Sequence, residues 1–211
     1  MFPSVFELLI ATSNEGKARE ISRILRPLPM QIRSLRDFPL LHLVDETAET
    51  YEENAIAKAI GYAAQTGLYA LADDSGLEVD ALAGRPGFLS ARYGGIALSD
   101  VDRNQKLLTS LAHIDGSKRA ARFVSVAVLA KPSEDTTTKG TVLAVERGIC
   151  EGRIALTQRG DHGFGYDSIF IPNGYHESFG ELTDSIKDKI SHRAQSMLRM
   201  RAFLEHLIRQ A

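Results

Sequence analysis

Strand-like apolar runs alternate along this chain with segments of helical periodicity, and this order constrains the fold more than any other feature. A buried strand is expected over residues 5–11, followed by a helix that stops before Pro27. Thr50 begins a second helix, with a glutamate three residues later as in a capping box, and Gly67 ends it. The next strand is expected over residues 68–72, where the apolar run stops at two adjacent aspartates. Strands that alternate with helices in this way predict an α/β fold.

The second half of the chain adds a hairpin to this pattern. Residues 122–130 and 141–146 read as two strands joined by the polar segment PSEDTTTKG. Helices are expected over residues 99–112 and 191–209, and the inward face of the last one is expected to carry Met197, Leu198, Phe203, Leu204 and Leu207. Helix-linked strands combined with a hairpin predict a mixed sheet. We find no linker or internal repeat, so we expect a single domain over residues 1–211.

The composition is that of an ordinary globular protein. Of the 211 residues 44 % are hydrophobic, and 25 Lys and Arg against 27 Asp and Glu leave a net charge of −2. That balance is a poor basis for holding a long polyanion, so we expect no nucleic-acid partner. The apolar N-terminus lacks the flanks of a signal peptide, and no run approaches the length of a membrane span. The single cysteine, Cys150, suits a reducing compartment, and we expect a cytoplasmic protein without a membrane partner.

The stretch LADDSG places the carboxylates of Asp73 and Asp74 side by side at the end of an apolar run. Two neighbouring negative charges repel, and a partly desolvated carboxylate needs a compensating partner. One interpretation is an Asx-type turn with both acids in water. The other is a divalent cation, Mg²⁺, that holds a phosphorylated substrate. The hexapeptide alone does not decide between them.

The stretch TSNEGK is predicted to be a strand-to-helix turn. It comprises Thr12, Ser13, Asn14, Glu15, Gly16 and Lys17. A helix start offers free backbone N–H groups and the positive end of the helix dipole, which makes it a natural anion site. Lys17 adds a point charge suited to phosphate. The alternative is a plain N-cap with a solvated lysine, and the spacing of a Walker loop is absent.

Two further stretches carry candidate ligands. Glu46 precedes the second helix, so the helix dipole that explains the acids of the first turn does not explain it. Phe164 lies between Gly163 and Gly165, where the glycines allow a flat ligand to approach and the ring offers a stacking face. The alternative for this stretch is a tight turn with Phe164 in the core.

The start of the last helix is basic. His192 and Arg193 occupy its first turn, where positive charge is unfavourable by about 0.3–1 kcal/mol. A sequence tolerates this arrangement most easily when an anion or a hydrogen-bonding ligand binds there. Lys187 and Lys189 extend the basic cluster upstream. Taken together, the stretches describe a nucleoside triphosphate pocket.

The chain resembles the inosine triphosphate pyrophosphatase family, whose members act on non-canonical purine nucleoside triphosphates. The resemblance spans almost the whole chain and rests on IATSNEGKAREI, ETAETYEENAIAKA, LADDSGLEVDALAGRPGFLSARYGG, ARF, GFGYDSIF and ELTDSIKDKISHRAQ. It implies a long mixed central sheet flanked by helices, two lobes with a cleft between them, and a homodimer. Ser168 departs from the family pattern, because a proline is common after the GFGYD segment.

The resemblance also implies a reaction, in which ITP, dITP or XTP is hydrolysed to the monophosphate and pyrophosphate. Glu46 and Asp74 would hold Mg²⁺, and Asp74 would also be the catalytic base. Substrate binding would fall to Thr12, Ser13, Asn14, Glu15, Gly16 and Lys17 for the triphosphate, and to Ser75, Phe164, Gly165, Tyr166, Asp167, Lys187, His192 and Arg193 for the rest of the nucleotide. Two alternatives are a Maf-like pyrophosphatase for modified pyrimidine or 7-methyl-guanine nucleotides and a non-enzymatic nucleotide sensor.

Overall fold

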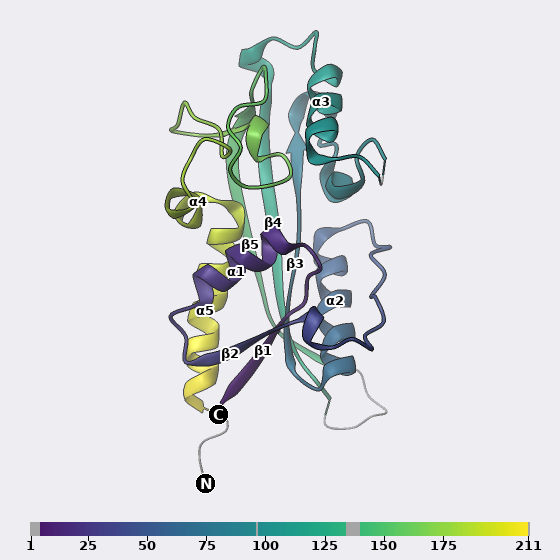
Figure 1. The fold of residues 1–211 in the computed structure, drawn as a ribbon, viewed down its shortest axis with the longest axis vertical. Helices are drawn as coiled ribbons and strands as arrows, with labels where there is room; N and C mark the ends of the chain where they lie inside the picture. The colour runs from purple at the N-terminus through teal and green to yellow at the C-terminus, as the bar shows by residue number, and fades with distance from the viewer. Residues whose placement is uncertain (1–4, 96, 134–139, 211) are drawn as a thin grey trace. The chain divides into compact units, whose positions relative to one another are not determined.

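The computed structural model describes residues 5–95, 97–133 and 140–210 (Figure 1). Along the chain the elements are β1 (Phe6–Ile10), α1 (Glu15–Leu25), β2 (Met30–Ser34), α2 (Tyr51–Thr66), β3 (Tyr69–Val79), α3 (Asp100–Ser110), β4 (Ala120–Lys131), β5 (Thr141–Ile154), β6 (Phe170–Pro172), α4 (Asp184–Ile190) and α5 (His192–Gln210). Six strands of the described chain form one sheet in the order β2-β1-β3-β4-β5-β6. β1 pairs in parallel with β2 and β3, whereas β6 pairs antiparallel with β5. The predicted α/β fold with a mixed sheet and flanking helices is therefore confirmed.

The chain divides into two compact units. The first unit comprises Met1–Asp74, Ser125–Arg147 and Arg193–Ala211, and the second comprises Ser75–Val124 and Gly148–His192. Strands β3, β4 and β5 each contribute residues to both units. The resemblance implies two lobes with a cleft between them, and both stay a prediction.

The core of the first unit lies on both faces of β1. Leu8 and Ile10 belong to a buried cluster with Ile21 of α1 and Met197 of α5. Leu9 alternates with them and is fully buried as well, because successive side chains of a strand point to opposite faces. Figure 1 shows α5 and α2 on opposite sides of the strands of this unit. A strand that is buried on both faces explains the continuous apolar run at its position in the sequence.

The core of the second unit is built around aromatic rings. The ring centroids of Phe123 and Phe170 lie 4.7 Å apart, and those of Phe170 and Phe179 lie 5.4 Å apart. Leu77 of β3 and Leu107 of α3 are fully buried in the same cluster. This cluster therefore anchors α3 and the segment around β6 to the strands of the second unit.

Capping residues set the helix starts as the sequence predicts. The side chain of Asn14 accepts a hydrogen bond from the backbone N–H of Lys17 at the start of α1. Thr50 and Ser99 cap α2 and α3 in the same way. Each side chain satisfies a backbone donor that would otherwise lack an intrahelical partner. The helices expected in these places are confirmed to within a residue or two.

The strand expected over residues 68–72 is present, but the position predicted for its end is wrong. β3 runs on through Asp73 and Asp74 to Val79, so the aspartates lie inside a strand and not in a turn. The acids do not interrupt the strand because buried partners distant in sequence compensate their charge, as described below. β2, β6 and α4 were not expected. Leu198 is 37 % exposed, so its place on the inward face of the last helix is also wrong.

The two strands of the expected hairpin are present as β4 and β5, which lie next to each other in the sheet. Both are longer than expected. Most of the PSEDTTTKG segment that joins them, residues 134–139, lies outside the described residues. No helix in the described part of the chain is both long and apolar enough to span a membrane.

Candidate functional site

Asp73 and Asp74 are both buried in β3. Asp73 has no exposed surface, and Asp74 is 6 % exposed. The interpretation of LADDSG as a turn with both acids in water is therefore wrong. Because adjacent residues of a strand point to opposite faces, the two carboxylates meet different partners.

Asp73 is surrounded by cations and a hydroxyl of the first unit. Its Oδ2 lies 3.1 Å from Nζ of Lys17 and 3.3 Å from Nε of Arg193. The hydroxyl of Ser125 donates to its Oδ1 at 2.5 Å. A buried carboxylate is stable only when it is paired and hydrogen-bonded, and Asp73 has both kinds of partner. Arg193 also forms an ion pair with Glu20, so this network links α1, β3, β4 and α5.

Asp74 faces a different cation. Nζ of Lys58 lies 2.9 Å from Oδ1 of Asp74 and 3.2 Å from Oε1 of Glu46. Burial raises the pKa of the Asp74 carboxyl, and the nearby ammonium groups of Lys58 and Lys17 only partly oppose this. Burial alone would lower the pKa of Lys58, but the carboxylates of Asp74 and Glu46 outweigh it, so that the pKa is raised.

The arrangement around Lys58 shows where a cation is stabilised. Its ammonium group contacts the two carboxylates, Glu46 and Asp74, that the resemblance assigns to Mg²⁺. Among the described residues no three His, Cys, Asp or Glu side chains are grouped as a metal site. Mg²⁺ commonly uses one or two carboxylates and completes its octahedral shell with water and phosphate oxygens. The donor set of Glu46 and Asp74 therefore fits this ion.

Lys58 is a further candidate residue of the site that the sequence analysis did not single out. It is buried on α2 between Ala55 and Tyr62, which lie three and four residues away and are buried as well. A lysine within the apolar face of a helix is unusual, because an unpaired buried ammonium group is unstable. That position in the helical pattern is the signal that could have found it.

The TSNEGK turn is both a capped helix start and part of this charged cluster. The cap alternative holds for Asn14, whose side chain accepts from the backbone N–H of Lys17 at 3.0 Å. It fails for Lys17, because only 15 % of that side chain is exposed and its Nζ contacts Asp73. Burial lowers the pKa of Lys17, and the Asp73 carboxylate partly opposes the shift. Gly16 is buried, and Thr12 accepts from the backbone N–H of Asn14 at 3.2 Å.

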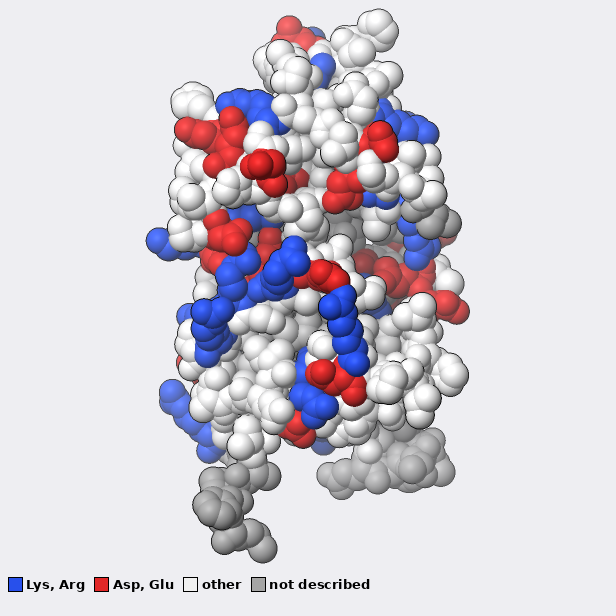
Figure 2. Space-filling view, in the orientation of Figure 1, with Lys and Arg blue, Asp and Glu red and all other residues white. Residues whose placement is uncertain are grey.

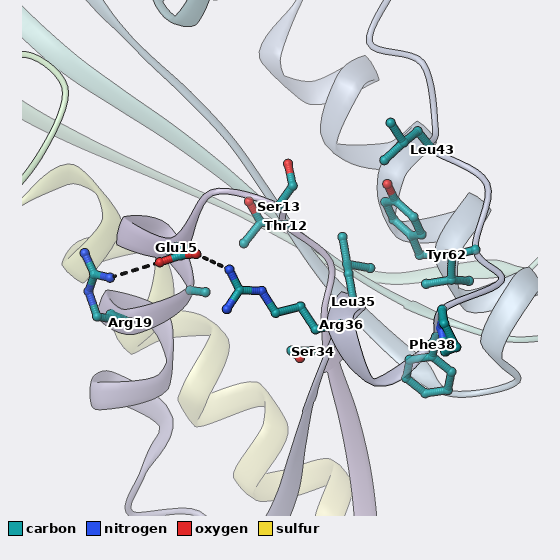
Figure 3. A pocket seen from close by; sticks show the side chains of 13 residues that line it. Thr12, Ser13, Glu15, Arg19, Ser34, Leu35, Arg36, Phe38, Leu43 and Tyr62 are labelled. Carbon is teal, nitrogen blue, oxygen red and sulfur yellow. Dashed lines mark hydrogen bonds and ion pairs between the residues drawn. The ribbon is translucent and has the colours of Figure 1, made fainter. Parts of the chain in front are cut away.

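Glu15, by contrast, belongs to the surface of this turn. Its carboxylate pairs with Arg36 and with Arg19 on the face where Figure 2 shows basic side chains over α1. These residues border a cavity of about 530 Å³ whose other side carries Leu35, Leu43 and Tyr62 (Figure 3). Thr12 and Ser13 also line this cavity. Leu35 and Leu43 offer no hydrogen-bond donors to a triphosphate, so the candidate phosphate ligands of this cavity lie on the side of the turn, where Thr12, Ser13, Arg19 and Arg36 line it.

In the second unit, the structure brings Phe164, Asp167 and Lys187 together. Asp167 accepts from the backbone N–H of Phe164 at 2.8 Å and pairs with Lys187, both charged side chains being buried. Nζ of Lys187 lies 4.9 Å from the centroid of the Phe164 ring, within the range of a cation–π contact. Phe164 is half-buried, so the alternative that places it in the core is wrong.

Tyr166 differs from its neighbours in this turn. Its hydroxyl donates to the backbone carbonyl of Ser90 at 2.8 Å, and only 4 % of the residue is exposed. This contact ties the turn to the segment that contains Ser90. Gly163 has a φ of +76°, and a Cβ there would lie 2.1 Å from Oδ2 of Asp167. The residue must be glycine for Asp167 to hold the turn.

The basic start of α5 has an explanation within the protein. Arg193 is 2 % exposed and pairs with Glu20 and Asp73, so two carboxylates offset its charge at this end of the helix. The helix dipole alone therefore does not require a bound anion at Arg193, and its role in substrate binding stays a prediction. His192 is 3 % exposed and its ring stacks on Phe123 at 4.6 Å. Ser75 follows Asp74 in β3 and is half-buried.

Comparison with known families gives a match over most of the chain. The model described as the Ham1 family matches residues 8–203. The dITP/XTP pyrophosphatase of Syntrophobacter fumaroxidans is 44 % identical over 202 residues, which cover 96 % of this chain and 83 % of that relative. The dITP/XTP pyrophosphatase of Bacillus subtilis is 42 % identical over 199 residues, which cover 94 % and 97 %.

Solved structures agree with this match. A HAM1 protein from Coxiella burnetii is 38 % identical, with a TM-score of 0.82 over 96 % of this chain and 100 % of that one. A nucleoside-triphosphatase described as a dITP/XTP pyrophosphatase, from Mycobacterium abscessus, is 39 % identical, with a TM-score of 0.69 over 94 % and 98 %. The likeness therefore extends from the sequence to the fold.

Proposed function

The chain belongs to the Ham1 family, and on this premise we propose that it is a nucleoside triphosphate pyrophosphatase that removes non-canonical purine nucleotides from the nucleotide pool. Its substrates are dITP, XTP and ITP, and its products are the nucleoside monophosphate and pyrophosphate. Relatives that are 42–44 % identical over nearly the whole chain are dITP/XTP pyrophosphatases. The single observation within the molecule that carries the proposal is the pair of buried aspartates with its separate sets of partners.

Asp74 is the residue that we assign as the base. Lys58 engages its Oδ1, and among the described residues no partner contacts its Oδ2. That oxygen can accept a proton from water while the water oxygen forms a bond to the α-phosphorus. The bond from the α-phosphorus to the bridging oxygen then breaks, and pyrophosphate leaves with the electron pair. The raised pKa of Asp74 makes it a better proton acceptor than an exposed aspartate.

Glu46 and Asp74 would hold Mg²⁺, which supplies charge neutralisation to the phosphate oxygens when it is bound. The backbone N–H groups of the 12–17 turn, together with Lys17, would bind the triphosphate. Asp73 holds the ammonium group of Lys17 in place, since Oδ2 of Asp73 and Nζ of Lys17 are 3.1 Å apart. This assignment gives the two aspartates separate roles, one chemical and one positional.

For the base and sugar, the candidates are Ser75, Phe164, Gly165, Tyr166, Asp167, Lys187, His192 and Arg193. The exposed part of Phe164 supports a stacking role, and its contact with Lys187 fixes the ring. The buried hydroxyl contact of Tyr166 supports a role in shaping the turn instead. The resemblance further supports a homodimer, and the single cysteine supports a cytoplasmic location.

A substrate panel tests the proposal. The purified protein is incubated with Mg²⁺ and with dITP, XTP, ITP, ATP, GTP, dUTP and 7-methyl-GTP, and pyrophosphate and phosphate are measured separately. We expect pyrophosphate from dITP, XTP and ITP, with slow turnover of the other nucleotides. Preferred turnover of dUTP or 7-methyl-GTP would identify a Maf-like enzyme, and binding without pyrophosphate release would identify a sensor.

A further inference from the structure

One face of α3 holds the glycine that follows Phe164. Asp100 and Asn104 are four residues apart on this helix, so their side chains lie one turn apart on the same face. The backbone N–H of Gly165 donates to Oδ2 of Asp100 at 2.7 Å. The amide of Asn104 donates to the backbone carbonyl of Gly165 at 2.9 Å. Both backbone polar groups of a single residue are therefore held by one helix.

The orientation of the Asn104 amide is fixed by these contacts. Its Nδ2 also donates to Oγ of Ser168 at 3.0 Å, so both amide protons are used. Its Oδ1 is buried and has no hydrogen-bond partner among the described residues. The carbonyl of Gly165 can only accept, so the reversed amide would set two acceptors against each other. The side chain thus leaves its own oxygen unsatisfied in order to hold Gly165 and Ser168.

Ser168 connects Asn104 to a second side chain. Its hydroxyl accepts from Asn104 and donates to Oε1 of Gln158 at 3.4 Å. Asn104 therefore restrains Ser168 as well as Gly165.

Gly165 itself provides no restraint of its own. Its φ is +61°, and a Cβ added there would meet no heavy atom within 4 Å. There is therefore open space beside its Cα, and glycine is the most flexible residue. Asp100 and Asn104 hold the peptide groups of Gly165 directly, whereas Asp167 holds the neighbouring N–H of Phe164.

We propose that Asp100 and Asn104 are positioning residues that set the base selectivity of the enzyme by clamping Gly165, and with it the turn from Phe164 to Asp167. This inference rests on the proposed function, because it takes that turn to receive the purine base. A site rejects the wrong base when its polar groups are left unpaired and cannot move to find new partners. Such rejection needs the groups held to within about 0.5 Å. A loosened turn adjusts to adenine and loses discrimination.

The first experiment compares Asn104→Ala with Gln105→Ala, an exposed neighbour on α3 whose side chain makes no hydrogen bond to the turn as far as the structure describes the chain. The values of kcat/KM for dITP and dATP are measured for wild type and both variants. Thermal unfolding of each protein shows whether the variants are folded. We expect the dITP/dATP ratio to fall about tenfold in Asn104→Ala, as the loss of two hydrogen bonds implies, and to stay unchanged in Gln105→Ala. If Asn104 had a purely structural role, kcat/KM would fall in parallel for dITP and dATP, and their ratio would stay constant.

The second experiment keeps the proposal testable if Asn104→Ala folds poorly. Asp100 also pairs with Arg103 at 2.9 Å, and both Asp100→Asn and Asp100→Ala lose that ion pair. Only Asp100→Asn retains an oxygen that can accept from Gly165. We expect a ratio close to wild type in Asp100→Asn and a several-fold lower ratio in Asp100→Ala. Equal ratios in the two variants would overturn the clamp while the wild-type preference for dITP still stands. A wild type that shows no such preference would instead overturn the proposed function.

Discussion

Adjacent aspartates in one strand have acquired different surroundings. Asp73 contacts two cations and a hydroxyl, and it has no exposed surface. Asp74 contacts one ammonium group through one oxygen and has a second oxygen available. The alternation of a β-strand separates the two carboxylates onto opposite faces, so that one can hold the site together while the other reacts.

The first prediction separates these two roles. Asp74→Asn is expected to lower kcat by at least about 10²-fold with nucleotide binding largely kept, since an amide cannot accept the proton from water. Asp73→Asn is expected to lower the free energy of unfolding by about 3–5 kcal/mol, because it leaves buried cations without their counter-charge. Steady-state kinetics and urea unfolding of both variants measure these effects. Near-wild-type turnover by Asp74→Asn would contradict the assignment of the base.

A second prediction concerns the hydroxyl pair behind Asp73. Ser125 has a single hydroxyl proton, which it donates to Asp73, so its Oγ can only accept in the 2.8 Å contact with Oγ of Ser196. The proton of Ser196 is shared between this contact and the backbone carbonyl of Arg193 at 3.1 Å. Ser125→Ala leaves Oδ1 of a buried carboxylate without this donor and is expected to lower the free energy of unfolding by about 1–3 kcal/mol.

Ser196→Ala is the matched control for that change. It removes a hydroxyl that is equally buried but leaves the bond from Ser125 to Asp73 intact. Its loss of stability in urea unfolding should be clearly smaller than that of Ser125→Ala. Equal losses in the two variants would mean that Asp73 does not depend on the hydroxyl of Ser125.

At the scale of the elements, the sequence predicted the start of a helix correctly where that start depends on a capping residue close by in the chain. Asn14, Thr50 and Ser99 each accept a hydrogen bond from a backbone N–H three residues on, and the helices begin where these residues predict. The end of β3 was wrong for the opposite reason. Asp73 is stabilised inside the strand by Lys17 and Arg193, which are distant in sequence, and no local pattern reveals such partners.

The same limit applies to the candidate site. The sequence indicated Asp74, Glu46 and Lys17, which the structure places in one charged cluster of the first unit. It did not indicate that Lys58 joins two of these residues, or that Glu20 offsets the charge of Arg193. The contacts of Lys58 and of Glu20 exist because the helix faces that carry these residues are buried. Which face of a helix is buried depends on the packing of the whole unit.

A third prediction tests the cap of α2, the helix that carries Lys58. The hydroxyl of Thr50 accepts from the backbone N–H of Glu53 at 3.2 Å and donates to its carboxylate at 2.8 Å. Thr50→Ala is expected to lower the free energy of unfolding by about 1 kcal/mol, whereas Thr50→Ser keeps the acceptor and should be close to wild type. Urea unfolding measures both variants. An unchanged midpoint for Thr50→Ala would show that the start of α2 is held by packing alone.

At the scale of the whole molecule, the modest net charge of −2 conceals a concentrated charged cluster in the first unit. The cluster joins the carboxylates Glu20, Glu46, Asp73 and Asp74 to the cations Lys17, Lys58 and Arg193. With every group ionised, the carboxylates are in excess by one. A nucleoside triphosphate carries about four negative charges of its own, so its approach to this cluster is electrostatically unfavourable unless a cation accompanies it.

The last prediction follows from this charge balance and concerns the stability of the folded protein. A ligand that binds only the native state raises its stability by about 2.7 kcal/mol at a hundred times its Kd, which corresponds to about 5–10 °C in Tm for a chain of this size. We expect a non-hydrolysable dITP analogue to produce such a rise with Mg²⁺ present and a much smaller one in EDTA. Mg²⁺ without nucleotide should shift Tm only slightly, because Glu46 and Asp74 supply only part of its shell.

The variant Glu46→Gln serves as a control. It should reduce the Tm shift that Mg²⁺ and the analogue produce together but not the small shift that the analogue produces in EDTA, since Glu46 acts through the metal. A full shift in EDTA would contradict the metal site, and the cations of the cluster would then be sufficient to bind the triphosphate.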